Sequence, residues 1–290
     1  MWFGFGRDGK FSKWFIIYLV GKKTKTSWVK MRLQPYERVI YDKNPLIEVI
    51  CQVRFPMVLR ISNQDPFEFQ EKIISDYPLC QKSTSLPIPT VIAQLIEQKR
   101  SFLSTNYIFQ SENSKWQVSL NEDSLSLATV EYTKYEEFRE KFCFLLKSFE
   151  DVYNIPFYLR VGLRYKDLIL RSKLNLKDKP WSELIDEYLV SELNNSELSE
   201  SIELINKSLE IKTDSLGKLK FNHGIVIAVD QSQPTTEEKG YLLDYDFYME
   251  GKVNKHDVLN RLDQFKQEAG TRFRSSITEQ LHKAMQPRPL

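Results

Sequence analysis

The sequence predicts an α+β protein in which antiparallel sheets carry packed helices, and three observations lead to this prediction. Segments with alternating apolar and polar residues follow one another in runs, and helical segments separate those runs. Apolar residues in 135–149, and again in 256–285, recur every three or four positions, which is typical of amphipathic helices. A doubly wound sheet would alternate strand and helix instead, so the pattern favours α+β with a long C-terminal helix.

The first half of the body combines a long strand, a short helix, a meander and an amphipathic helix. β-Branched residues with a proline on each side predict the first strand, and period-two alternation predicts the others. The strands expected here are 46–55, 106–110, 116–120, 125–127 and 157–166. The helices expected here are 67–75, which follows the helix-start pair Asp65-Pro66, and 135–149.

The second half begins with a helical segment and ends with the longest helix of the chain. The strand-like runs are 201–213, 218–229 and 241–250. The helices are 181–193 and 256–285. The polar stretch 230–240 is expected to be an exposed loop, Asn254 to cap the last helix, and Gly270 to bend it. Because both halves place strands before a helix, 31–175 and 176–290 are expected to form two similar α+β halves.

Residues 1–30 differ in composition from the rest of the chain. They carry seven basic side chains and one acidic side chain, and their apolar run at 14–20 is too short for a membrane-spanning helix of about 20 residues. We expect this basic, aromatic leader to lie outside the native fold, with Met31 as the native start. Two alternatives are an arm that packs on the body as an extra strand, and a tail that binds a membrane surface or nucleic acid.

The leader also determines the sign of the net charge. The whole chain has 41 basic and 39 acidic side chains, which gives +2, whereas the chain without the leader has 34 and 38, which gives −4. The basic excess of the whole chain therefore does not support nucleic-acid binding by the body.

The sequence lacks the residue patterns that are typical of several catalytic and metal-binding classes of protein. The three cysteines are widely spaced and form no C-x-x-C pair, which excludes a zinc ribbon or a thioredoxin-like site and fits reduced thiols in a cytoplasmic protein. The three histidines stand in none of the usual metal-binding spacings. No nucleophile elbow, P-loop or dinucleotide fingerprint occurs. We therefore expect no catalytic residues, no cofactor and no membrane span.

One strand, 157–166, has an apolar face and a basic face. The basic face carries Arg160, Arg164 and Lys166 around Gly162, which permits close approach. Two guanidinium groups and an ammonium group on one side of a strand can hold a phosphate or a carboxylate. The alternatives are a solvated face, ion pairs with neighbouring Asp or Glu, and contact with another protein. These four residues are the candidate anion-binding site.

Three carboxylates lie within strand segments. Asp244 and Asp246 share one face of their strand, where paired carboxylates can hold Mg²⁺ for phosphoryl chemistry. No neighbouring Glu-x-Lys or His completes a nuclease set, so an arginine-paired or solvent-facing role is favoured over a metal site. Glu48 lies in an otherwise apolar strand and needs a cation, for which Arg164 is the expected partner; a general base is the alternative.

Four short segments occur in an order that is specific as a set. They are Pro-Leu-Ile-Glu-Val at 45–49, Arg-Val-Gly-Leu-Arg-Tyr at 160–165, Leu-Leu-Asp-Tyr-Asp at 242–246 and Phe-x-x-x-Ile-Thr at 273–278. Together they resemble a sporadically distributed prokaryotic family without an assigned activity, over nearly the whole body. Members of that family begin shortly before the first segment and often have Asn after the Arg-Tyr pair, where this chain has Lys166. The resemblance carries over no catalytic residue, and patchy occurrence is typical of defence and toxin–antitoxin loci.

Three functional hypotheses remain open. The first is a non-catalytic binding or regulatory protein, with a protein partner or a second copy of itself, in a prokaryotic defence or toxin–antitoxin system. The second is a nucleic-acid or nucleotide-binding module that uses Arg160 and Arg164. The third is a metal-dependent nuclease around Asp244 and Asp246. Co-purification with the products of neighbouring genes would distinguish the first from the others.

Overall fold

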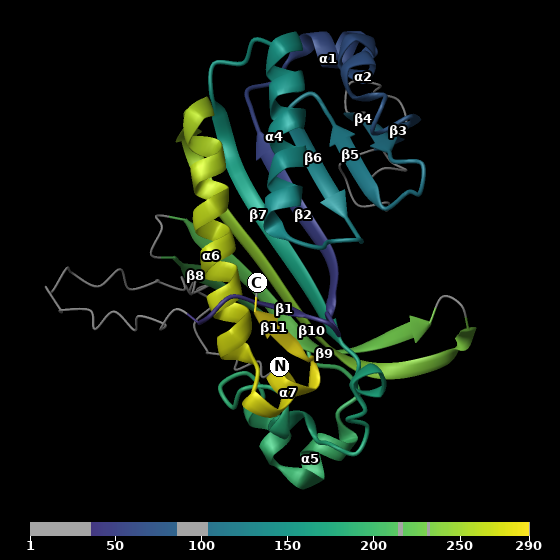
Figure 1. Cartoon of the computed structure of the whole chain (residues 1–290), viewed down its shortest axis with the longest axis vertical. Helices are drawn as coiled ribbons and strands as arrows, with labels where there is room; N and C mark the ends of the chain where they lie inside the picture. Colours follow the sequence, from purple (N-terminus) through teal and green to yellow (C-terminus); the bar gives the residue numbers. More distant parts are fainter. Residues whose placement is uncertain (1–35, 86–103, 214–216, 231–232, 290) are drawn as a thin grey trace, which may run out of the picture. The chain divides into compact units, whose positions relative to one another are not determined.

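One large antiparallel sheet joins the two halves of the chain. The computed structural model describes residues 36–85, 104–213, 217–230 and 233–289. The sheet has the strand order β3-β4-β5-β6-β2-β7-β10-β9-β8, and β1 and β11 form a separate two-stranded ribbon (Figure 1). The strands are β1 Val39–Tyr41, β2 Leu46–Arg54, β3 Leu79–Ser85, β4 Ser104–Gln110, β5 Trp116–Leu120, β6 Ser124–Thr129, β7 Tyr158–Ile169, β8 Lys207–Lys212, β9 Lys218–Asp230, β10 Gln233–Val253 and β11 Pro287–Pro289.

The helices connect and cover these strands. The α-helices are α1 Leu59–Asn63, α2 Phe67–Ile73, α4 Tyr135–Val152, α5 Ser196–Ser201, α6 Val258–Ser276 and α7 Glu279–Ala284. The 3₁₀ turns are η2 Arg171–Leu174, η3 Trp181–Glu183, η4 Ser191–Asn194 and η5 Lys255–Asp257. The α+β class is confirmed, with antiparallel pairing throughout the described strands. Of the described helices, none is long and apolar enough to cross a membrane.

The strand order is mirrored about its centre. β2 opens the first half and pairs with β6, the last strand of the meander that follows it. β7 opens the other half of the sheet and pairs in the same way with β10. β2 and β7 then pair with each other at the centre. The expected boundary at 175/176 falls after β7, so the pair of β7 with β10 joins the expected halves 31–175 and 176–290 in one sheet, within the single compact unit Leu33–Leu290. The expectation for the leader 1–30 lies outside the described residues.

The described helices that cover the sheet pack on one of its faces. In α4 the apolar stripe is buried as the sequence predicts, and Phe149 lies 4.6 Å from Phe55 between ring centroids. Phe265 of α6 packs on Phe247 of β10 in the same way, at 6.2 Å. Each such aromatic side chain stabilises the fold by roughly 1.5–3 kcal/mol through its burial. The opposite face of the sheet has no described helix over it (Figure 1).

The C-terminal helix is shorter than the sequence predicts. The expected helix 256–285 divides into α6 and α7, and the break falls at Ile277 and Thr278 rather than at Gly270. Ile277 forms a β-bridge with Ile185, and the Thr278 hydroxyl accepts a hydrogen bond from the Leu281 N–H, which caps α7. Backbone pairing with a distant segment therefore ends α6, which a helical periodicity alone cannot reveal.

The same backbone pairing explains why 181–193 is not a helix. The Asp186 N–H donates to the Ser276 carbonyl at 3.0 Å, and the Thr278 N–H donates to the Leu184 carbonyl at 3.0 Å. These bonds draw the segment out of helical geometry, and it forms the turns η3 and η4 instead. Its buried apolar residues keep the three- and four-residue spacing that suggested a helix.

Two further expectations in the second half are wrong. The run 201–213 contains the end of α5 and only the short strand β8. The expected loop 230–240 belongs largely to β10, where Glu237, Glu238 and Lys239 pair with β9. This part of the β9–β10 hairpin exposes apolar side chains as well, with Ile227 52% and Val229 51% exposed. The amino-acid composition of a segment reflects how exposed it is to solvent. An exposed β-hairpin can therefore be as polar as a loop.

Candidate functional site

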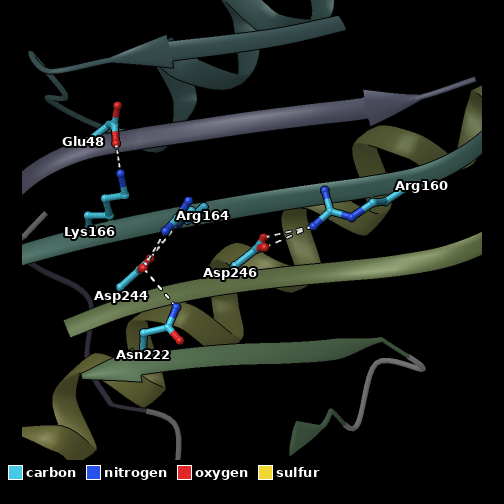
Figure 2. A network of polar contacts seen from close by, with 7 residues as sticks. All are labelled: Glu48, Arg160, Arg164, Lys166, Asn222, Asp244 and Asp246. Atoms are coloured by element: carbon cyan, nitrogen blue, oxygen red, sulfur yellow. Dashed lines mark hydrogen bonds and ion pairs between the residues drawn. The ribbon is translucent and has the colours of Figure 1, made fainter. Parts of the chain in front are cut away.

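The residues that the sequence singled out lie together on the uncovered face of the sheet. Alternation along β7 turns Val161 and Leu163 into the core and places the candidate anion-binding residues on the other side. Glu48 of β2 and the two aspartates of β10 reach the same side from the neighbouring strands (Figure 2). We call this surface the open face; its central members are Glu48, Gln52, Arg160, Gly162, Arg164, Lys166, Asn222, Asp244 and Asp246.

The strongest contact of the open face is a two-pronged ion pair between Arg164 and Asp244. Arg164 Nε donates to Asp244 Oδ1 at 2.7 Å, and Nη2 donates to Oδ2 at 2.6 Å. Asn222 Nδ2 adds a longer bond to Oδ2 at 3.3 Å. The Asp244 side chain is only 5% exposed, and the hydrogen bonds to it raise the pKa of Arg164. Such bidentate, partly buried pairs are geometrically specific.

Arg160 forms the second pair, with Asp246. Its Nη2 lies 3.1 Å from Asp246 Oδ2, and its Nη1 donates to Gln52 Oε1 at 3.2 Å. The guanidinium also stacks on the Tyr248 ring, 4.8 Å from the centroid. Burial raises the pKa of Asp246, while Arg160 and Arg164 act in the opposite direction.

Gly162 leaves room for the Arg160–Asp246 pair rather than for a ligand. A Cβ atom at Gly162 would lie 2.6 Å from Arg160 Nη1, so the missing side chain leaves room for the guanidinium group of Arg160. A group does approach the backbone closely at Gly162, as the sequence predicts. That group is the guanidinium of Arg160 and not a ligand.

The third pair corrects the expected partner of Glu48. Lys166 Nζ donates to Glu48 Oε2 at 2.5 Å, whereas Arg164 is held by Asp244. The register explains the difference, since Glu48 stands opposite Lys166 and Arg164 stands opposite Ile50. The choice between two cations on one strand face depends on this register, which the sequence does not determine.

The three pairs limit what the site can do chemically. Arg160, Arg164 and Lys166 are each neutralised by a carboxylate, so an anionic ligand would have to displace a carboxylate that is already bound. Asp244 and Asp246 are held by arginines in the same way, which leaves few free oxygens for a cation. Within the described ranges, no group of three or more His, Cys, Asp or Glu side chains has a metal-binding arrangement.

Sequence reasoning missed Gln52 and Asn222, which complete the network. Alternation from Glu48 places Gln52 on the same side of β2, so this residue could have been found from the strand alone. Asn222 could not, because its contact depends on β9 lying beside β10. The sequence places neither strand in the order of the sheet.

On the β3–β6 side of the sheet the open face carries mainly uncharged polar side chains. In β3–β6 the residues that alternate with the core are largely amides and hydroxyls. They include Gln81, Asn106, Gln110, Gln117, Ser119 and Ser126. The open face is therefore polar over most of its width and nearly balanced in charge at its centre.

No protein-family model and no curated protein matches this sequence.

Proposed function

We propose that this chain is a non-catalytic binding protein that recognises a protein partner through the open face. The observation that carries the proposal is that, in the described part of the chain, the covering helices lie on one face of the sheet and the other face consists mainly of polar, half-buried side chains. An antiparallel sheet can leave one face to water, but here the side chains of that face are held in a connected set of ion pairs and hydrogen bonds. Ordered polar side chains give a partner fixed hydrogen-bonding groups.

The internal ion pairs support recognition by contact rather than by charge. Because each cation already has a carboxylate, a partner that covers the pairs does not bury an uncompensated charge. The side chains are also held in place before binding, which reduces the loss of side-chain entropy in a complex. These features suit a polar protein surface with few net charges.

A nucleic acid is the weaker candidate for the same face. Most nucleic-acid affinity comes from cations that neutralise phosphates. On the open face the arginines of β7 are engaged by Asp244 and Asp246, and residues 31–290 carry a net charge of −4. The hypothesis of a metal-dependent nuclease loses support for the same reason, since both aspartates hold arginines.

Site-specific photo-crosslinking tests the proposal. A crosslinking amino acid at Ser126, in the open face, is compared with one at Lys147, on the solvent side of α4. The probes are the proteins encoded next to this gene, each purified separately, which also tests the expected defence or toxin–antitoxin setting. We expect one of them to crosslink from Ser126 and not from Lys147.

Substitutions that change the charge at the same two positions test the surface by affinity. Ser126→Arg is expected to weaken binding of the crosslinked protein at least tenfold, and Lys147→Glu to leave it unchanged. Crosslinking from both positions alike, from neither, or only to added single-stranded or duplex DNA would contradict recognition of a protein by the open face.

A further inference from the structure

A cavity lies on the helix side of the sheet, directly behind the open face. It encloses about 180 Å³ between β7, α6 and the segment that runs from β1 into β2. An adjoining outer space of about 300 Å³ shares several of its walls. Aromatic rings line the inner cavity: Tyr41, Tyr132, Tyr165, Tyr245 and Phe273.

The aromatic walls are held in place by their own contacts. Tyr41 packs edge to face on Phe273 at 5.9 Å, and Tyr132 packs edge to face on Tyr165 at 6.0 Å. The Tyr41 hydroxyl lies 2.8 Å from His282 Nδ1, and the Tyr245 hydroxyl donates to Ser276 Oγ at 2.8 Å. The Tyr165 hydroxyl differs from these two: it is buried, and its neighbour in the described part of the chain, the Tyr132 side chain, offers it no hydrogen bond of normal geometry.

A second unmatched polar group lies in the same cavity. Asp167 points to the helix side of β7 and is 5% exposed. Among the described residues, no hydrogen bond or ion pair reaches its carboxyl group. Burial, with a smaller contribution from Asp244 on the other side of the sheet, raises its pKa from the ordinary 3.8 to about 8. A buried carboxyl group without a partner is destabilising unless something else compensates for it.

The mouth of the cavity is basic. Lys266 of α6 lines both the inner cavity and the outer space. Burial, together with the neighbouring Arg38, lowers the pKa of Lys266. The outer space is also bordered by Lys134 and Arg274. The cavity thus has an acidic floor, aromatic walls and a basic rim.

We propose that the cavity binds a small zwitterion, with a primary or secondary ammonium group at Asp167 and an anionic group at Lys266. On binding, Asp167 would release its proton to solvent, and the ammonium N–H groups would donate to the resulting carboxylate and to the Tyr165 hydroxyl, so both groups gain a partner. A quaternary ammonium ion has no N–H and would leave the hydroxyl unmatched. The surrounding rings favour a cation through their faces, and Lys266 offers an ammonium group to an anion.

The direct test is calorimetric binding of 5-aminopentanoate at neutral pH. Pentanoate lacks the cation and pentylamine lacks the anion, and the two compounds otherwise match the probe in length. We expect 5-aminopentanoate to bind, pentylamine to bind at least tenfold more weakly, and pentanoate not to bind measurably. Absence of binding by the amino acid, or equal binding of pentanoate, would overturn the proposal.

Two variants locate the ligand within the cavity. Asp167→Asn keeps the shape of the side chain and is expected to weaken 5-aminopentanoate at least tenfold. Lys266→Met is expected to reduce the affinity for 5-aminopentanoate to that for pentylamine, and to leave pentylamine unchanged. If 5-aminopentanoate bound to Asp167→Asn as tightly as to the wild type, the assignment would be wrong.

Gly270 supplies a control that does not touch the charged groups. It lines the cavity from α6, and a Cβ atom built on it meets no atom within 4 Å, so a side chain there enters open space. Gly270→Leu is expected to abolish binding by filling the mouth. Gly270→Ala is expected to retain it and to stabilise α6 by roughly 0.5–1 kcal/mol. Thermal unfolding of each variant verifies that it folds, and retained binding in a folded Gly270→Leu protein would exclude this cavity.

Discussion

Lys166 and Asp167 are neighbours on β7, but only Lys166 has an ion-pair partner on its side of the sheet. Lys166 points to the open face and pairs with Glu48, as Arg160 and Arg164 pair with their aspartates. Asp167 points into the cavity and has no described partner for its carboxyl group. The paired charges hold the strands in register. The unmatched carboxyl group is the one to which a ligand can add a partner, which makes the cavity a stronger candidate for a small-molecule site than the basic strand face.

The largest expected effect is a pH-dependent gain in stability when Asp167 becomes Asn. Because the folded protein raises the pKa of Asp167 to about 8, the carboxyl group favours folding most at a pH below its ordinary pKa of 3.8. That advantage is lost as the pH rises toward 8. Between roughly pH 5 and 7 the wild type should lose about 1.4 kcal/mol per pH unit relative to Asp167→Asn.

Urea unfolding of both proteins across this pH range measures the difference. The comparison isolates Asp167 from the titratable groups around it. On the cavity side these include Tyr41, Tyr132, Tyr165, Tyr245, Lys266 and His282, and Asp244 lies behind the sheet. Parallel stability curves would show that the carboxyl group has a partner after all, and the contrast with Lys166 would disappear.

A smaller loss is expected when a paired charge of the open face loses its partner. Asp244→Ala leaves Arg164 partly buried without its carboxylate and should lower the free energy of unfolding by roughly 2–3 kcal/mol. The double variant Arg164→Met with Asp244→Leu removes both charges and should recover much of this loss. Chemical denaturation measures both, and a double variant no more stable than Asp244→Ala would mean that the pair does more than neutralise its own charges.

The smallest effect is expected at the most exposed of the three pairs. Glu48 and Lys166 are 29% and 27% exposed, so Glu48→Gln should cost only roughly 0.5–1 kcal/mol, and less at high salt. Glu112→Gln, in an exposed turn, is the control and should leave stability unchanged. A loss at Glu48 as large as that at Asp244 would show that burial does not rank these pairs.

The sequence predicts best those features that depend on local spacing. Helix α4 and strand β5 were predictable because their apolar residues repeat with the period of a single element. Alternation also places Arg160 and Arg164 on one face of β7. Continued by two residues beyond Tyr165, the same alternation would have placed Asp167 in the core, where a carboxyl group is unexpected.

Features that depend on distant pairing were not predictable. The break between α6 and α7 and the loss of the helix at 181–193 both follow from bonds between Leu184–Asp186 and Ser276–Thr278. The assignment of Lys166 rather than Arg164 to Glu48 follows from the register of β2 on β7. No local pattern reports which strands are neighbours or how they are aligned.

The mirrored order of the sheet has a consequence for how the chain folds. The meander of each half is local in sequence, whereas the seam between β2 and β7 joins residues as far apart as Gln52 and Arg160, which are separated by 108 positions. Closing so long a loop is slow compared with forming a hairpin. We expect the hairpins of the meanders to form first and the long-range pairs, which include this seam, to close later, so the central bonds from Arg160 and Lys166 to β2 mark a late step of folding.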